Sequence, residues 1–196
     1  MVNMGIDRVF LGAMADSAQL GLYAAANLFV GAFFFIPTAL IGTLAPKLIA
    51  QHGKSIGSFH SQAGKLFSNV GAVLLSIVIA ISIFSGDIIN LVFGEHYFGA
   101  GKVLAISCWS ILFVFQVSLR GRLLIIEGRQ KELSMLISLG TFTNVLLNYF
   151  LIPHYGAVGA AYAFSISWFA SALVFPAIFI NTRKYILMCF GVTPNL

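Results

Sequence analysis

Residues 148–167 read NYFLIPHYGAVGAAYAFSIS, and this stretch decides how the chain folds. It is almost entirely apolar, and its one interruption is Pro153-His154-Tyr155-Gly156. Because proline and glycine interrupt helices and mark turns, we predict that two helices are folded against each other here. Small residues then recur at spacings of four, three and four, which aligns them on one stripe where a neighbouring backbone can approach closely. These are Gly156, Ala160, Ala163 and Ser167.

The composition extends this apolar character to the whole chain. Hydrophobic residues make up 59% of the 196 residues and charged residues 9%, whereas about 25% of residues are charged in soluble domains. Four segments hold no Asp, Glu, Lys or Arg, and a membrane-spanning helix needs about 20 residues. They are 17–46 (30 residues), 66–86 (21), 103–119 (17) and 133–182 (50), so the last has room for two helices.

These segments predict an all-α, polytopic membrane helix bundle. Helices are expected rather than barrel strands because the runs are long and do not alternate polar with apolar residues. A segment at Met1–Ala15 would extend only about 22 Å, short of the hydrocarbon core of about 30 Å, and we expect it to be a truncated helix. The five complete spans are predicted at Leu20–Leu48, Leu66–Gly86, Val103–Ile126, Leu133–Ile152 and Ala157–Ile180.

The basic residues predict the orientation in the membrane. Cytoplasmic connections are enriched in Lys and Arg, so the connection 47–65 is expected inside, together with the tail 183–196. This assignment leaves Lys102 alone outside and explains a pI near 9.4 without any need for nucleic-acid binding. The nine basic residues on the inner side are Lys47, Lys54, Lys65, Arg120, Arg122, Arg129, Lys131, Arg183 and Lys184.

Charged residues at membrane depth are the first candidates for a functional site, because such groups usually face a wet cavity or a partner. Arg8 lies about 12 Å along a helix from Asp16, which brings it close to the midplane. The alternatives are an ion pair with Asp7 or an interfacial position. Arg120 shares a helix face with Gln116 near the inner end of its span, where it lines a lumen or extends to the interface.

Two amides are the next candidates. Asn144 and Asn148 are separated by four residues and therefore share one helix face, with Thr141 one turn earlier. Hydrogen bonding between helices is the commoner role of such amides, and binding of a hydroxyl-rich substrate is the alternative.

The sequence contains no recognisable motif for catalysis, disulfide bonding or metal binding. The two cysteines, Cys108 and Cys189, show neither a disulfide nor a metal spacing, and the four histidines make no ligand set. No nucleophile triad, carboxylate pair, phosphate loop or zinc motif occurs. We therefore expect no enzyme activity, no cofactor and no metal.

A series of motifs resembles the second half of a bacterial polysaccharide flippase, one of the O-antigen and exopolysaccharide transporters of the multidrug/oligosaccharidyl-lipid/polysaccharide exporter superfamily. The series runs in order over nearly the whole chain. It comprises IDRVFLG (6–12), GLYAAANLF (21–29), FFFIPTALIGTLAPKL (33–48), LVFGEHYFGAGKVLAI (91–106), LLIIEGRQKEL (123–133) and NVLLNYFLIPHYGAVGAAYAFSIS (144–167).

The resemblance implies one lobe of a transporter with two six-helix lobes around a central cavity. Such proteins are thought to move an undecaprenyl-pyrophosphate-linked oligosaccharide to the outer leaflet of the bacterial inner membrane. Residues 1–182 would form the C-terminal lobe, with a missing N-terminal lobe and other polysaccharide assembly proteins as partners besides lipid. Arg8 and Arg120 would supply the cationic cavity, and Asp7 a coupling or pairing carboxylate. Asn144 and Asn148 are candidate cavity-lining groups from their spacing, not from the resemblance.

Three alternatives remain open. A multidrug or cation antiporter of the same architecture would use intramembrane carboxylates, of which Asp7 is the one candidate. An enzyme that polymerises or ligates glycans would need a large outer loop, and the predicted loops are short. A non-transporting bundle subunit would tolerate replacement of Arg8 and Arg120 by Leu.

Overall fold

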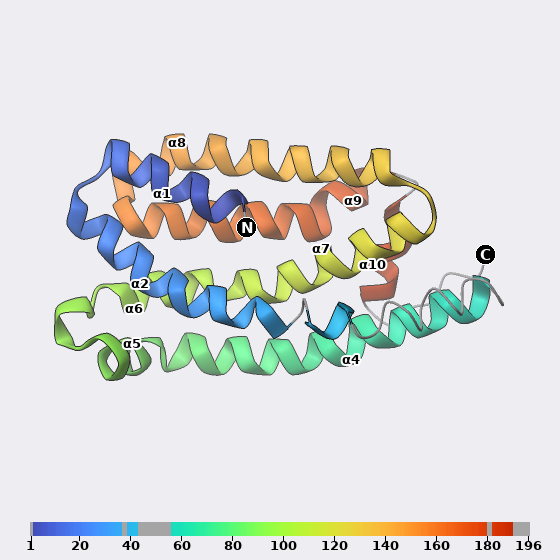
Figure 1. Ribbon diagram of the computed structural model, residues 1–196, viewed down its shortest axis with the longest axis horizontal. Coiled ribbons are helices and arrows are strands. Elements are labelled where there is room, and N and C mark those ends of the chain that lie inside the picture. Colours follow the sequence, from blue (N-terminus) through green and yellow to red (C-terminus); the bar gives the residue numbers. More distant parts are fainter. Residues whose placement is uncertain (1, 37–38, 43–55, 180–181, 190–196) are drawn as a thin grey trace.

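The computed structural model describes residues 2–36, 39–42, 56–179 and 182–189, and within these ranges the regular structure is helical, with no strand (Figure 1). The all-α prediction is therefore confirmed for the described residues. The elements are α1 (Val2–Met14), α2 (Ser17–Phe33), α4 (Ile56–Ile83), α5 (Ser85–Phe93), η1 (Glu95–Tyr97), α6 (Ala100–Ser107), α7 (Trp109–Ile126), α8 (Gln130–Phe169), η2 (Ala170–Val174), α9 (Phe175–Ile178) and α10 (Arg183–Cys189).

The predicted reversal lies inside α8. Gly156 has φ 53° and ψ −129°, which is outside the helical region, and the two limbs of α8 run antiparallel beside each other (Figure 1). The limbs are closely packed beside the reversal, because a Cβ added at Gly159 would overlap the carbonyl oxygen of Leu151. Ala160, Ala163 and Ser167 are buried, as the small-residue stripe predicts.

The predicted number of spans is wrong when judged by continuous helices. The described residues contain three helices long and apolar enough to cross a membrane, at Ser61–Ile83, Ala100–Ile126 and Gln130–Ile178. One reason is that the last two predicted spans are the two limbs of the third helix, which reverses at Gly156. The other is that α2 ends at Phe33, with a turn at Phe34, and residues 43–48 of the predicted Leu20–Leu48 span lie outside the described residues.

The first segment is a short helix, as predicted. α1 has 13 residues, and α2 begins after Asp16, whose side chain accepts a hydrogen bond of 2.8 Å from the Gln19 amide and so caps the helix. Gln19 also reaches the α8 reversal, where its Oε1 accepts a hydrogen bond of 2.9 Å from the Ala157 amide. The start of α2 thus fixes the position of the second limb of α8.

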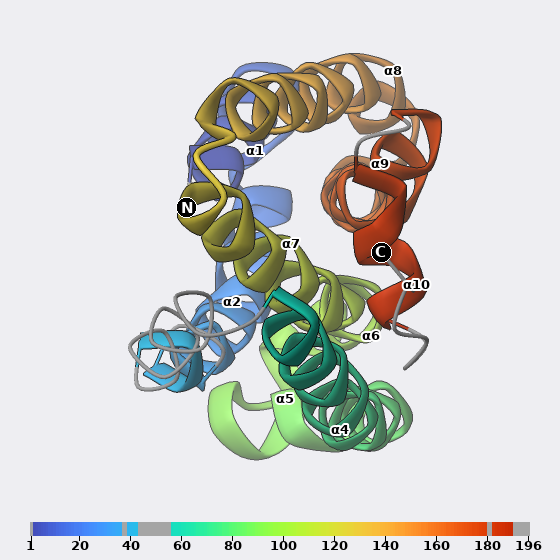
Figure 2. The ribbon, with the colours of Figure 1, turned by 90° about the vertical axis from the view of Figure 1, so that its right-hand side faces the viewer.

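Helix α7 runs through the middle of the bundle (Figure 2). In the end view of Figure 2, α1 and α8 lie on one side, α4 and α5 on the other, and α7 runs between them. Large apolar side chains such as Leu11, Phe115 and Phe164 are fully buried between the helices. Others remain on the outside, including Leu91, which is 88% exposed, as is typical of a surface that faces lipid rather than water.

Candidate functional site

The carboxylate of Asp7 is fully buried between three helices. Tyr23 of α2 donates its hydroxyl to Oδ2 at 2.5 Å. On α8, Asn144 and Asn148 donate their Nδ2 groups to Oδ1 at 2.9 and 2.6 Å. All four side chains have exposed fractions of 0%, and these three described donors are neutral. We call Asp7, Tyr23, Asn144 and Asn148 the Asp7 cluster.

Local helix geometry explains how the cluster forms. Asn144 and Asn148 are one turn apart on the first limb of α8, so both amides face the same neighbour, and Asn148 Nδ2 also donates to Asn144 Oδ1 at 3.3 Å. The connection at Ala15–Asp16 folds α1 back toward α2, which brings Tyr23 to the same carboxylate. Asn144 lies 11 residues after Leu133, about 16 Å along the helix and near the middle of the predicted span.

Two buried polar residues of α2 were not predicted from the sequence as site residues. Tyr23 completes the set of described donors to Asp7, and Asn27, one turn further along α2, is 1% exposed. The signal was present in the sequence, because Tyr23 and Asn27 have the same four-residue spacing in an apolar segment as Asn144 and Asn148.

Arg8 lies elsewhere. It follows Asp7 on α1 and its side chain is exposed, so it points away from the buried carboxylate. The described donors to Asp7 are Tyr23 and the two asparagines rather than Arg8. The structure therefore brings together three of the five candidate residues and leaves Arg8 outside this group.

Arg120 lies at a second location, the wall of a cavity of about 530 Å³ between α7, α8 and η2. It is 3% exposed, and its Nη1 and Nη2 groups donate to the carbonyl oxygens of Ala172 and Ser171 at 2.9 and 2.6 Å. The cavity is lined mainly by apolar groups, and its polar lining includes Ser118, Arg120, Arg122, Thr141, Trp168 and Ser171.

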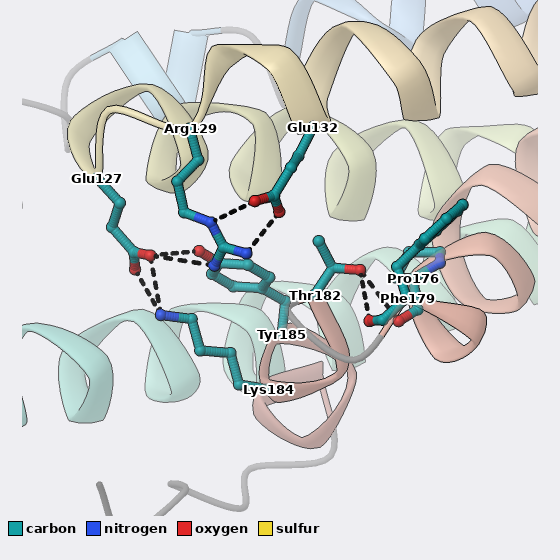
Figure 3. Close-up of polar contacts among 8 residues, drawn as sticks. All are labelled: Glu127, Arg129, Glu132, Pro176, Phe179, Thr182, Lys184 and Tyr185. Atoms are coloured by element: carbon teal, nitrogen blue, oxygen red, sulfur yellow. Dashed lines mark hydrogen bonds and ion pairs between the residues drawn. The ribbon is translucent and has the colours of Figure 1, made fainter.

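A third polar group joins α10 to the turn between α7 and α8 (Figure 3). Glu127 accepts hydrogen bonds from Lys184 Nζ at 2.8 Å and from the Tyr185 hydroxyl at 2.7 Å. Arg129 lies 3.7 Å from Glu127 and donates from Nε to Glu132 at 2.9 Å. Burial, and then the neighbouring Glu127 carboxylate, raise the pKa of Tyr185 well above its ordinary value, so the phenol stays a donor. This network fixes the start of the tail on the helix ends.

In the part of the chain that the structure describes, no three His, Cys, Asp or Glu side chains gather in a group that could hold a metal ion.

Comparison with known proteins gives one relative and no family assignment. No known family description matches the chain, and no solved structure is similar to it. The chain is 25% identical over 177 residues to the capsular polysaccharide biosynthesis protein CapF of Staphylococcus aureus. The match covers 88% of this chain and 44% of CapF, so the chain spans less than half the length of that relative. A chain of apolar, membrane-type helices is thus similar to a polysaccharide biosynthesis protein.

Proposed function

We propose that this chain is one lobe of a membrane flippase that moves an undecaprenyl-pyrophosphate-linked oligosaccharide from the inner to the outer leaflet of the bacterial inner membrane. The product serves surface polysaccharide biosynthesis, of the O-antigen or exopolysaccharide type. The observation that carries the proposal is the Asp7 cluster, a carboxylate held inside a bundle of apolar helices by neutral donors.

Burial of a carboxylate inside a membrane bundle is itself an indication of function. An acidic side chain in a membrane bundle is expensive, and where it occurs it commonly marks a substrate pathway, a proton relay or an ion site. Asp7 has three hydrogen-bonding side chains directed at it from α2 and α8. A coupling ion, either a proton or a small cation, would act at this carboxylate and drive the transport cycle.

The similarity to CapF supports the substrate class. That relative is named for capsular polysaccharide biosynthesis, and the similarity extends over 88% of this chain. The flippases that the sequence resembles are thought to move lipid-linked oligosaccharides across the membrane. A bundle of apolar helices with a carboxylate inside it is suited to transport and, as predicted from the sequence, we do not expect it to act as an enzyme.

The proposal includes a second lobe. The chain spans 44% of the length of CapF, and alternating access needs one bundle to rock against another around a site between them. The site would lie between residues 1–182 and a partner lobe, with the tail 183–196 in the cytoplasm. Arg8 and Arg120 remain the groups proposed to meet the diphosphate, because guanidinium offers paired donors to phosphate oxygens.

Complementation tests the proposal. The chain would be co-expressed with the N-terminal half of a polysaccharide flippase in a strain that lacks its own flippase. We expect restored surface polysaccharide with wild-type Asp7 and background levels with Asp7→Asn, at equal amounts of protein in the membrane. Absence of rescue by the wild-type pair, with both halves present in the membrane, would contradict the proposal.

The same carboxylate favours a second candidate, a multidrug or cation antiporter lobe, since an intramembrane carboxylate attracts cationic substrates. Resistance to cationic drugs in the co-expressing strain, without any rescue of polysaccharide, would favour this function instead.

A further inference from the structure

The helix that follows the second limb of α8 is irregular just before Pro176. Residues Ala170–Val174 form a π-helical turn, and the Phe175 amide donates to the carbonyl of Ala170, five residues back. Pro176 follows immediately and has no N–H group. In an α-helical pattern residue 176 would donate to the carbonyl of Ala172, and in a π-helical pattern to the carbonyl of Ser171. Proline can donate to neither.

The two carbonyls that Pro176 cannot serve are the ones that Arg120 binds. Nη1 of Arg120 donates to Ala172 at 2.9 Å, and Nη2 donates to Ser171 at 2.6 Å. Arg120 comes from a different helix, α7, 51 and 52 residues away in sequence. The planar guanidinium suits this position, because its two terminal nitrogens can reach two neighbouring oxygens at once, whereas a lysine ammonium is a single point.

The carbonyls of Ser171 and Ala172 lie in a buried, apolar environment, where hydrogen-bond donors must come from the protein. Ala172 has an exposed fraction of 0% and Ser171 of 7%, and the stretch belongs to the apolar helix Gln130–Ile178. In a membrane the backbone groups freed by a proline must be satisfied by the protein, since water does not reach them. Hydrogen bonds from a charged donor are also stronger than those between neutral groups.

We propose that the Arg120 guanidinium replaces the amide missing from Pro176, and so holds the irregular end of the last span against α7. The two residues act as a pair: Pro176 leaves the carbonyls without a backbone donor, and Arg120 supplies the hydrogen bonds. This inference does not depend on which substrate the protein carries.

The pair also shapes the cavity. Arg120, Ser171 and Gly140, which is on the first limb of α8, all line it. A Cβ at Gly140 would overlap Ser171 Oγ, so the first limb is in close contact with the bend. A shift of residues 171–172 would therefore change the cavity wall. A phosphate that enters the cavity would compete with two backbone carbonyls for the Arg120 guanidinium.

A double-mutant cycle on the full chain, purified in detergent, tests the pairing. We expect Arg120→Met alone to lower the apparent Tm by about 5–10 °C, because two buried carbonyls lose charged donors. Pro176→Ala supplies a backbone amide at residue 176. The new amide can serve one of the two carbonyls, so in that background we expect Arg120→Met to lower the Tm by about half as much as in the wild-type chain, and Arg120→Lys alone should fall between wild type and Arg120→Met.

Arg122 provides the matched control, since it lies two residues further along α7 and is exposed. Arg122→Met should leave the Tm unchanged in both backgrounds. Equal losses from Arg120→Met with and without Pro176 would overturn the proposal, as would no loss in either. If Arg120→Met cannot be purified, recovery of the double variant supports the pairing, and failure of the double variant where Pro176→Ala is recovered refutes it.

Discussion

Asn148 of α8 donates a hydrogen bond of 2.6 Å to the carboxylate of Asp7 in α1, although 141 positions separate the two residues. Asn144 donates to the same oxygen, and Tyr23 of α2 donates to the other. One carboxylate therefore connects the first helix, the second helix and the first limb of α8. The carboxylate is thus a structural link between helices as well as the group proposed to couple transport to an ion, and substitution can separate these two roles.

Asp7→Asn is expected to abolish transport while the protein still folds. The amide keeps the shape of the carboxylate but has one acceptor oxygen, so part of the donor set loses its acceptor, at about 1–3 kcal/mol. We expect transport, measured as surface polysaccharide in the complemented strain, to fall at least about tenfold with only a modest loss of Tm.

Asp16→Asn is the matched control, because Asp16 is an exposed carboxylate at the N-cap of α2 and asparagine caps a helix about as well. This variant should keep both transport and Tm. Transport at wild-type levels in Asp7→Asn would remove the carboxylate from the mechanism.

Gly159→Ala is expected to destabilise the hairpin in α8. The added Cβ would overlap the carbonyl oxygen of Leu151, and this backbone atom cannot move aside without opening the hairpin. Overpacking of this kind costs about 1–3 kcal/mol, or a fall of about 3–10 °C in Tm. Gly12→Ala is the control, since a Cβ there meets nothing within 4 Å. Similar Tm values for the two variants would mean that the limbs are not in close contact.

Tyr185→Phe is expected to lower stability by about 1 kcal/mol at neutral pH, because the hydrogen bond to Glu127 is lost. The pKa of Tyr185 is raised in the folded protein, so the unfolded chain loses the phenolic proton first. The contribution of Tyr185 to the free energy of unfolding is therefore fully present below about pH 10, the ordinary pKa of tyrosine. It is lost as the pH rises above that value.

The measurement is the difference in Tm between wild type and Tyr185→Phe from pH 8 to pH 11. The difference should be constant up to about pH 10 and shrink above it. Tyr155→Phe, at an exposed position in the α8 reversal, serves as the control and should match wild type throughout. A difference that grows above pH 10 would contradict the assigned role of Tyr185.

The sequence predicted the parts of the fold that follow from local rules. The hairpin at Pro153–Gly156 could be predicted because a proline and a glycine interrupt an apolar run of known length. The shared face of Asn144 and Asn148 follows from helix periodicity alone. The break of the second helix at Phe34 could not be predicted, because the apolar run continues through it without a charge.

Local sequence patterns could not predict which polar side chains form hydrogen bonds between helices. Asp7 has Arg8 as its neighbour in sequence, which made an ion pair the simple alternative, but the two side chains leave a helix in different directions and Arg8 is exposed. For Arg120 the sequence left two alternatives, lining a lumen or extending to the interface; the side chain is buried in the wall of a cavity. Its bonds to Ser171 and Ala172 depend on how α7 packs against η2, which only the tertiary structure gives.

Every functional inference depends on the α8 hairpin crossing the membrane twice, and site-specific labelling measures this directly. Gln130 and Tyr155 are exposed at opposite ends of the first limb, so each would be replaced by cysteine in a chain lacking Cys108 and Cys189. An impermeant thiol reagent applied to intact cells without an outer-membrane barrier should label Tyr155→Cys, and should label Gln130→Cys only after the membrane is opened. Labelling of both positions from the same side would contradict the account.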